Sequence, residues 1–335
     1  MLSPAPLLEL GIASRDDFMA ASREHKEPFV IRGRVRDWPL TIAAKSPKTL
    51  TDYLRNFHNG TLVSLMTGVP AIKGRLFYME GFERLNFQTR DAPFADALQA
   101  ILRTASEENP PTLYMGSASE AKHWPGLARA NPLSLLPTDV IPNLWMGNRA
   151  VVGPHNDHPH NIACVVAGRR RFRLFPPEQF PNLYIGPMEL NPAGRPVSVV
   201  SVSSPDLERY PRYAHALEVS REAVLEAGDA IYIPSLWWHS VESLEPFNLL
   251  VNYWWEEPGT NAAQVEAALV HALLAMGPLT PEQRLAWRAV FDHVVFRASG
   301  DPVAHIPLAA RGLLGELTPD LRDRMRNIIR RSLIE

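Results

Sequence analysis

The alternation of hydrophobic and polar positions divides the chain into three regions. Residues 1–111 mix helical and strand-like periodicity, whereas residues 112–257 consist of short apolar runs separated by Gly and Pro. Residues 258–335 place apolar side chains at helical spacing. Short apolar runs with frequent turns are typical of antiparallel strands in a barrel or sandwich. The pattern therefore predicts a mostly β protein, with a mixed α/β N-terminal part packed on a β core and a C-terminal helical extension.

Individual elements follow from caps, turns and periodicity. In the first region, Ser14 followed by Asp16 is typical of a capped helix, which we expect to begin there. The other elements expected in this region are a strand over 28–33, a turn over 36–39, a helix over 47–57, β-like segments over 61–66 and 75–79, and a helix over 94–105. In the core we expect strands over 112–115, 143–147, 161–167, 170–175, 230–233 and 248–254. Gly168 separates the third strand from the fourth, which predicts a hairpin.

The C-terminal region is predicted to be entirely helical. Three helices are expected over 261–276, 281–296 and 319–333. The last two begin with Thr280-Pro281 and Thr318-Pro319, a cap followed by proline at the first helical position. In the first helix, Val265, Leu269 and Leu273 recur at helical spacing. Such a stripe either packs onto the β core or joins two copies of the chain.

Composition narrows the class of protein. Hydrophobic residues form 46% of the 335 positions, so the chain as a whole is not disordered. A formal net charge of −2 gives no overall attraction to nucleic acid or an anionic membrane, although Arg169-Arg170-Arg171 form a local basic patch. The one cysteine, Cys164, lies in an apolar run and is expected to be buried. No apolar run approaches the roughly 18 residues of a membrane span, and the N-terminus lacks a signal-peptide pattern. We expect a cytoplasmic protein.

A histidine-rich stretch in the middle of the chain carries the candidate chemistry. His155 and Asp157 are two residues apart, so on an extended backbone both side chains lie on one face. His239, which follows another strand-like run, is the best third ligand. Two imidazoles and one carboxylate match the 2-His-1-carboxylate facial triad, which leaves coordination positions open and suits Fe(II) oxygenase chemistry. The alternatives are a polar loop without metal, or ligation by His158 or His160 in place of His155.

Several motifs together resemble the JmjC/cupin-8 family. The segments that carry the resemblance are 155–177, 228–243 and 252–254, with 27–33 and 37–39 near the N-terminus. The resemblance spans about residues 20–257. It implies a double-stranded β-helix (jelly-roll or cupin) core over 112–257 that holds Fe(II) and uses 2-oxoglutarate and O₂.

The resemblance also implies roles for single residues. His155, Asp157 and His239 match the iron ligands of the family. Arg170 stands where the asparaginyl hydroxylase of that family has a lysine that binds the distal carboxylate of 2-oxoglutarate, and Tyr114 resembles the tyrosine that assists. Arginine can clamp a carboxylate with two hydrogen bonds, but it is longer than lysine and the replacement is not conservative.

Other positions are candidates for the co-substrate and substrate site. Asn161 and Asn252 match family asparagines near the co-substrate, or are satisfied polar residues within strands. Val152 stands where the relative has a hydroxyl residue. Four aromatic residues that either line a substrate cleft or belong to the core are Trp237, Trp238, Trp254 and Trp255.

The sequence therefore predicts an Fe(II)/2-oxoglutarate-dependent dioxygenase of the hydroxylase type, acting on a protein side chain, a peptide or a small molecule. In the asparaginyl hydroxylase the C-terminal helices form a dimer interface, so a homodimer through residues 258–335 is expected. The alternatives are a non-catalytic cupin-like binding module and a metal-dependent cupin enzyme that does not use 2-oxoglutarate. Hydroxylation and demethylation share the same iron chemistry, so the triad does not separate them.

Overall fold

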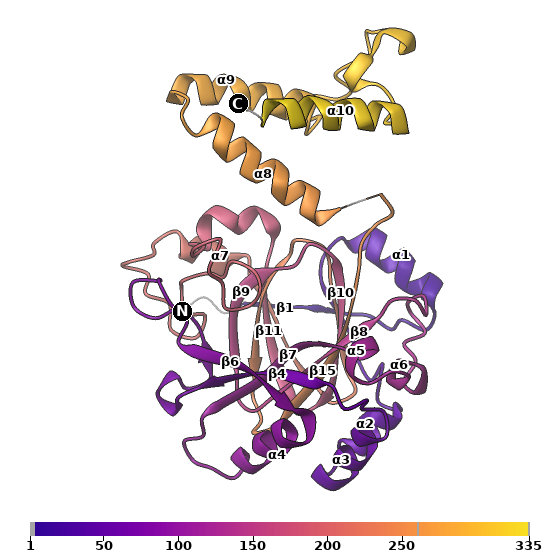
Figure 1. Ribbon diagram of the computed structural model, residues 1–335, viewed down its shortest axis with the longest axis vertical. Coiled ribbons are helices and arrows are strands. Elements are labelled where there is room, and N and C mark those ends of the chain that lie inside the picture. The colour runs from indigo at the N-terminus through magenta and orange to yellow at the C-terminus, as the bar shows by residue number, and fades with distance from the viewer. Residues whose placement is uncertain (1–3, 260, 334–335) are drawn as a thin grey trace. The chain divides into compact units, whose positions relative to one another are not determined.

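Two compact units make up the part of the chain that the computed structural model describes, residues 4–259 and residues 261–333 (Figure 1). The strands, all in the first unit, are β1 (Ala5–Pro6), β2 (Leu8–Glu9), β3 (Phe29–Ile31), β4 (Leu62–Gly68), β5 (Arg75–Leu76), β6 (Phe87–Pro93), β7 (Thr112–Ser119), β8 (Pro142–Gly147), β9 (Val151–Asn156), β10 (His160–Ala167), β11 (Arg169–Phe175), β12 (Arg221–Glu226), β13 (Ala230–Ile233), β14 (Trp238–Ser243) and β15 (Asn248–Trp255). Its helices are α1 (Arg15–His25), α2 (Pro39–Ala43), α3 (Pro47–Arg55), α4 (Phe94–Thr104), α5 (Glu120–His123), α6 (Leu127–Ala130) and α7 (Tyr213–Glu218), with short 3₁₀ turns η1 (Pro70–Ile72) and η2 (Pro177–Asn182).

The strands form two sheets. One has six strands in the order β1-β12-β11-β14-β9-β5, and the other has nine in the order β2-β3-β13-β10-β15-β8-β7-β4-β6. From β8 to β11 the chain alternates between the sheets strand by strand, and it alternates again from β12 to β15. This alternation builds a double-stranded β-helix, so the predicted fold class, a jelly-roll or cupin core with flanking helices, is confirmed.

Burial explains why the central strand is continuously apolar. Successive side chains of β10 point to opposite faces, and nearly all of them are buried. Ala163 and Val165 pack between the two sheets with Phe172 of β11, whereas Ile162 and Cys164 pack in the larger cluster that includes residues of α1 to α4. Cys164 is therefore buried, as predicted.

The N-terminal segment extends both sheets and covers one of them. Strands β1 and β5 belong to the six-stranded sheet, and β2, β3, β4 and β6 belong to the nine-stranded sheet. The predicted helix cap is present, because the Ser14 hydroxyl accepts a hydrogen bond from the Asp17 backbone N–H and the Asp17 carboxylate accepts one from the Ser14 N–H. The turn expected at 36–39 is present over 36–37 and leads into a helix, α2, with Trp38 at its N-cap. Strand β6 was not predicted, because its side chains are mostly exposed and polar.

The predicted hairpin at Gly168 is wrong. Strand β10 pairs with β13 and β15, whereas β11 pairs with β12 and β14 in the other sheet. Gly168 has φ +75°, and a Cβ there would lie 2.6 Å from the backbone oxygen of Phe247. The glycine therefore makes a tight turn, as expected, but the turn carries the chain from one sheet to the other, so that both strands face the same interior.

The second unit is helical. Its elements are α8 (Ala262–Met276), α9 (Pro281–Val294) and α10 (Pro319–Ser332), with 3₁₀ turns η3 (Leu308–Ala310) and η4 (Gly312–Leu314). Thr280 and Thr318 cap α9 and α10 as predicted, each accepting a backbone N–H three residues on. The apolar stripe of α8 is exposed: Val265, Leu269 and Leu273 show 67%, 48% and 56% of their surface. None of the described helices is long and apolar enough to span a bilayer.

Candidate metal and co-substrate site

Adjacent antiparallel strands bring the candidate metal ligands together. His155 of β9 and His239 of β14 are directly paired in register, and their ring centroids are 4.3 Å apart. Asp157 follows β9 by one residue, and its Oδ2 atom lies 3.6 Å from Nε2 of His239. The three residues offer ligand atoms that all lie within 4.8 Å of one another. The structure thus places the proposed 2-His-1-carboxylate set around one point.

Backbone carbonyls fix which nitrogen of each imidazole faces that point. Nδ1 of His155 lies 2.9 Å from the carbonyl oxygen of Gly153, and Nδ1 of His239 lies 3.1 Å from that of Trp237. A carbonyl can only accept, so each Nδ1 carries the hydrogen and each Nε2 presents its lone pair. Metal-binding histidines commonly have this outer hydrogen bond. The residues therefore fit a divalent metal.

Burial keeps His239 neutral. Its side chain is almost fully buried, and burial together with the neighbouring His155 lowers the pKa of His239 from 6.5 to about 4, against the opposing effects of Asp157 and the hydrogen bond to Trp237. A neutral imidazole is the form that binds metal. Near neutral pH the site is thus ready for a cation without first losing a proton from this ring.

Neither of the other histidines in the stretch belongs to the described metal group. Nδ1 of His160 accepts a hydrogen bond from the Ser235 N–H at 3.4 Å and lies 2.9 Å from the Tyr232 hydroxyl. Its Nε2 therefore carries the hydrogen, which faces Glu257 at 3.7 Å. The ring lies nearly parallel to those of Tyr232 and Trp255, with centroids 6.0 and 5.4 Å away. His160 has a structural role beside the site.

Strand alternation separates Arg170 from the other arginines of β11. Those three, each paired at 2.6 Å with a carboxylate, are Arg169 with Glu245, Arg171 with Glu242, and Arg173 with Glu222. Arg170 lies on the opposite face with Phe172, only 2% exposed. Among the residues that the structure describes, no carboxylate pairs with it: its Nη2 donates to the Trp145 carbonyl at 3.4 Å, and its Nε has no partner.

A buried cation without an anion is costly, and the pKa of Arg170 reflects this. Burial lowers the pKa of Arg170 from its ordinary value, while the nearby Tyr114 hydroxyl acts in the opposite direction. Guanidinium groups lose hydration on burial and regain it only through hydrogen bonds or ion pairs. An anionic ligand would supply the missing partner. Arg170 and Tyr114 therefore offer a carboxylate-binding position.

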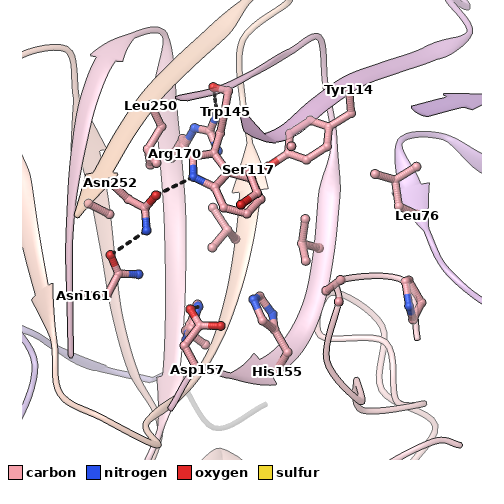
Figure 2. A pocket seen from close by; sticks show the side chains of 18 of the residues that line it. Leu76, Tyr114, Ser117, Trp145, His155, Asp157, Asn161, Arg170, Leu250 and Asn252 are labelled. Atoms are coloured by element: carbon pink, nitrogen blue, oxygen red, sulfur yellow. Dashed lines mark hydrogen bonds and ion pairs between the residues drawn. The ribbon is translucent and has the colours of Figure 1, made fainter. Parts of the chain in front are cut away.

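An amide network joins the two ends of the site (Figure 2). The Trp145 indole N–H donates to Oδ1 of Asn252 at 2.7 Å, and Nδ2 of Asn252 donates to Oδ1 of Asn161 at 3.1 Å. Both asparagines are buried. They are satisfied by each other and by Trp145, a residue that sequence reasoning did not assign to the site. In the sequence, Trp145 could be recognised only as an aromatic residue within the strand predicted over 143–147.

One cavity of about 230 Å³ contains all of these groups. Figure 2 shows Arg170 and Tyr114 near one end and His155 and Asp157 near the other. Val152 lines the wall where the family relative has a hydroxyl. Other lining residues that the sequence did not single out are Ser117 and, in the loop between η2 and α7, Pro192, Ala193 and Gly194.

The four tryptophans divide between core and cavity. Trp237 and Trp238 are buried in apolar clusters, and Trp255 packs against Phe18 and His160. Trp254 lines the cavity, and its buried indole N–H has no hydrogen-bond partner within the described part of the chain.

Comparison with known proteins agrees with the geometry. A family model described as a cupin-like domain matches residues 15–261. The chain is 42% identical to lysine-specific demethylase JMJ31 of Arabidopsis thaliana over 34% of this chain and 20% of that protein. It is 35% identical to HSPB1-associated protein 1 of Homo sapiens over 43% of this chain and 30% of that protein. The human bifunctional peptidase and (3S)-lysyl hydroxylase JMJD7 is 26% identical over 68% of this chain and 77% of that protein.

The relatives and the family model match different shares of the chain. The chain spans between a fifth and a third of the length of the first two relatives, whereas the family model covers most of the β unit. The resemblance noted in the sequence is therefore confirmed at the level of the family. The chain belongs to the cupin-like domain family, within the JmjC/cupin group that includes Fe(II)/2-oxoglutarate oxygenases.

Proposed function

We propose that this protein is an Fe(II)- and 2-oxoglutarate-dependent oxygenase of the hydroxylase type. One observation carries the proposal: Arg170, buried and without a carboxylate partner among the described residues, shares a cavity with the His155, Asp157 and His239 cluster. A cation at one end and a metal site at the other suit a dicarboxylate whose 2-oxo acid end faces the metal. Fe(II), when bound with 2-oxoglutarate and O₂, supplies oxidative decarboxylation coupled to substrate oxidation.

The residues of the chain have separate tasks in this proposal. Nε2 of His155, Nε2 of His239 and the Asp157 carboxylate would hold the iron, while Arg170 and Tyr114 would bind the distal carboxylate of 2-oxoglutarate. Three protein ligands on one face leave the other positions to co-substrate and O₂. Apolar side chains such as Leu76, Phe172 and Leu250 form much of the cavity wall, and such walls limit the access of water to the reacting atoms.

An anaerobic titration tests the proposal. Adding Fe(II) and then 2-oxoglutarate to the purified full chain should produce a weak visible charge-transfer band, and purified enzyme with O₂ should release succinate. Asp157→Ala should abolish the band. Iron binding that survives both His155→Ala and Asp157→Ala, with no band in the wild type, would contradict the proposal.

A second candidate keeps the metal but not 2-oxoglutarate, since Arg170 replaces the family's lysine and Val152 its hydroxyl residue. The same titration separates the two. If Arg170→Met leaves 2-oxoglutarate binding unchanged, the metal-dependent cupin alternative replaces the oxygenase. If the protein retains no metal after incubation with iron, a non-catalytic cupin-like module is favoured instead.

A protein or peptide is the substrate class that the relatives favour. JMJ31 is named a lysine-specific demethylase and JMJD7 a lysyl hydroxylase. Both names describe oxidation at a lysine side chain. We therefore include a protein side chain as the first substrate to screen, with mass spectrometry distinguishing addition of oxygen from loss of a methyl group.

The C-terminal helices are proposed to form a homodimer. Large apolar side chains remain exposed along α8 and α9, including Val270, Leu274, Leu285, Trp287 and Val290. An apolar surface of this kind on a monomer marks an interaction site. A second copy of the chain would bury it symmetrically.

A further inference from the structure

A second cavity, of about 280 Å³, lies on the outer face of the six-stranded sheet. Four neighbouring strands form its floor, β11, β14, β9 and β5. Its side chains alternate with those of the metal cavity: Arg171 follows Arg170, and Ser240 follows His239. A loop, residues 200–203, forms its roof. The cavity is therefore separate from the metal site, with the sheet between them.

Two arginines attach the roof to the floor. Nη1 of Arg173 donates to the Val202 carbonyl at 3.4 Å, and Nη2 of Arg75 donates to the Val199 carbonyl at 3.5 Å. The Arg75 guanidinium also lies over the Phe77 ring, 3.7 Å from its centroid. Two hydrogen bonds thus connect the 199–203 segment to the sheet, and the Arg75 guanidinium is positioned by a carbonyl and an aromatic ring.

The charges around this cavity do not balance. Arg171 pairs with Glu242 and Arg173 with Glu222, each at 2.6 Å. Lys73 and Arg75 also line the cavity, and among the described residues neither has a carboxylate partner. Burial lowers the pKa of Arg75, with Tyr210 opposing. Two cations are therefore left for a ligand, one of them partly desolvated.

We propose that this outer cavity binds a phosphate group, either free or carried by a small phosphorylated metabolite. Arg75 and Lys73 supply the positive charge, and the Ser201 and Ser203 hydroxyls, 3.4 Å apart in the roof, can donate to phosphate oxygens. Arginine matches the geometry of phosphate with two parallel hydrogen bonds, and lysine adds a point charge. The cavity is too small for a macromolecule and suits one phosphate with a compact attachment.

Calorimetric titration of the full chain tests the site with inorganic phosphate and with AMP, using adenosine as the uncharged control. We expect binding at about 1 mM or tighter, and about tenfold weaker binding in Lys73→Gln, the loss of one charge-assisted hydrogen bond. Lys73 is exposed and makes no hydrogen bond to the roof in the described structure, so its substitution tests ligand binding and not loop anchoring. Arg75→Gln should weaken binding further. Arg129→Gln, an exposed cation on α6, should change nothing.

The outcomes separate this site from the metal cavity. Arg170→Gln should leave phosphate binding unchanged; loss of binding there, or equal affinities of wild type, Lys73→Gln and Arg75→Gln, overturns the proposal. Absence of binding up to about 10 mM phosphate and AMP, or equal binding of adenosine and AMP, also overturns it. Binding of AMP alone identifies a phosphorylated metabolite as the source, and binding of both shows that free phosphate suffices. None of these results depends on oxygenase activity.

Discussion

His155 and His239 are cross-strand partners whose imidazole rings lie 4.3 Å apart, each with Nδ1 hydrogen-bonded to the backbone carbonyl two residues earlier in the chain. The sheet itself therefore sets the spacing of the two nitrogen ligands. Movement of one strand relative to the other would separate them. Predictions about metal, co-substrate and stability follow from this arrangement and from the residues around it.

Removal of a metal ligand should abolish iron binding, whereas removal of a nearby histidine should not. We expect His155→Ala and Asp157→Ala to weaken Fe(II) binding by roughly 100-fold or more, because each leaves two ligands. His160→Gln should keep iron affinity and lose about 1 kcal/mol of stability with its hydrogen bonds. Anaerobic metal titration and urea unfolding measure both. Loss of iron in His160→Gln alone would contradict this assignment.

Replacing Arg170 should improve stability while impairing co-substrate binding. Arg170→Met removes a buried cation with no carboxylate partner in the described structure, so the ligand-free protein should gain about 1–3 kcal/mol in its free energy of unfolding. The same change should weaken 2-oxoglutarate binding roughly 100-fold. Arg171→Met, on the outer face, is the matched control, and it should leave 2-oxoglutarate affinity unchanged.

The asparagine network should be sensitive to loss of either amide. Asn252→Leu leaves the Trp145 indole N–H and the Asn161 carbonyl oxygen without their buried partners. We expect a loss of about 2–4 kcal/mol in the free energy of unfolding, since each buried unsatisfied group costs about 1–3 kcal/mol. Urea denaturation of the metal-free protein measures this. A loss below about 0.5 kcal/mol would show that water replaces the amide.

The stability of the metal-free protein should fall in mild acid. The folded-state pKa of His239 is lowered from 6.5 to about 4 by burial and by His155, so between these values the unfolded chain binds a proton that the folded chain does not. This contribution is fully present above about pH 6.5 and is lost as the pH falls toward 4, on the order of 2–3 kcal/mol. Urea unfolding with chelator across that window measures the slope, and His239→Gln should flatten it.

The oligomeric state should depend on the C-terminal helices. The full chain is expected to be a dimer by light scattering, and Leu269→Glu with Leu273→Glu should make it monomeric by placing charges on the exposed stripe. Gln264→Glu adds a charge elsewhere on α8 as the control. A monomeric wild type at all concentrations would contradict the proposed homodimer.

The sequence predicted the ligands because their signals are local. The two-residue spacing predicts that His155 and Asp157 lie on one side of an extended segment, and His239 follows a clear apolar strand. The hairpin prediction at Gly168 failed because a glycine turn has the same local chemistry whether the next strand pairs with the last or crosses to the other sheet. Strand pairing depends on segments far away in the chain, so β10 and β11 were placed in one sheet instead of two.

The contacts that the buried site residues make with each other could not be predicted from the sequence. Trp145 contacts Asn252 across the pairing of β8 with β15, a register that no local pattern encodes. The absence of a carboxylate near Arg170 among the described residues likewise depends on three-dimensional packing. Sequence alone showed an arginine in a basic turn, and alternation along β11 explains why only this one lies inside.

The distance along the chain between β9 and β14 has a consequence for biosynthesis. A nascent chain that has left the ribosome only as far as β13 contains His155 and Asp157 but not the second imidazole. The proposed iron site would therefore be incomplete until β14 has emerged and paired with β9. If these residues hold iron as proposed, loading of the metal follows closure of the barrel, and incompletely translated fragments would not retain it.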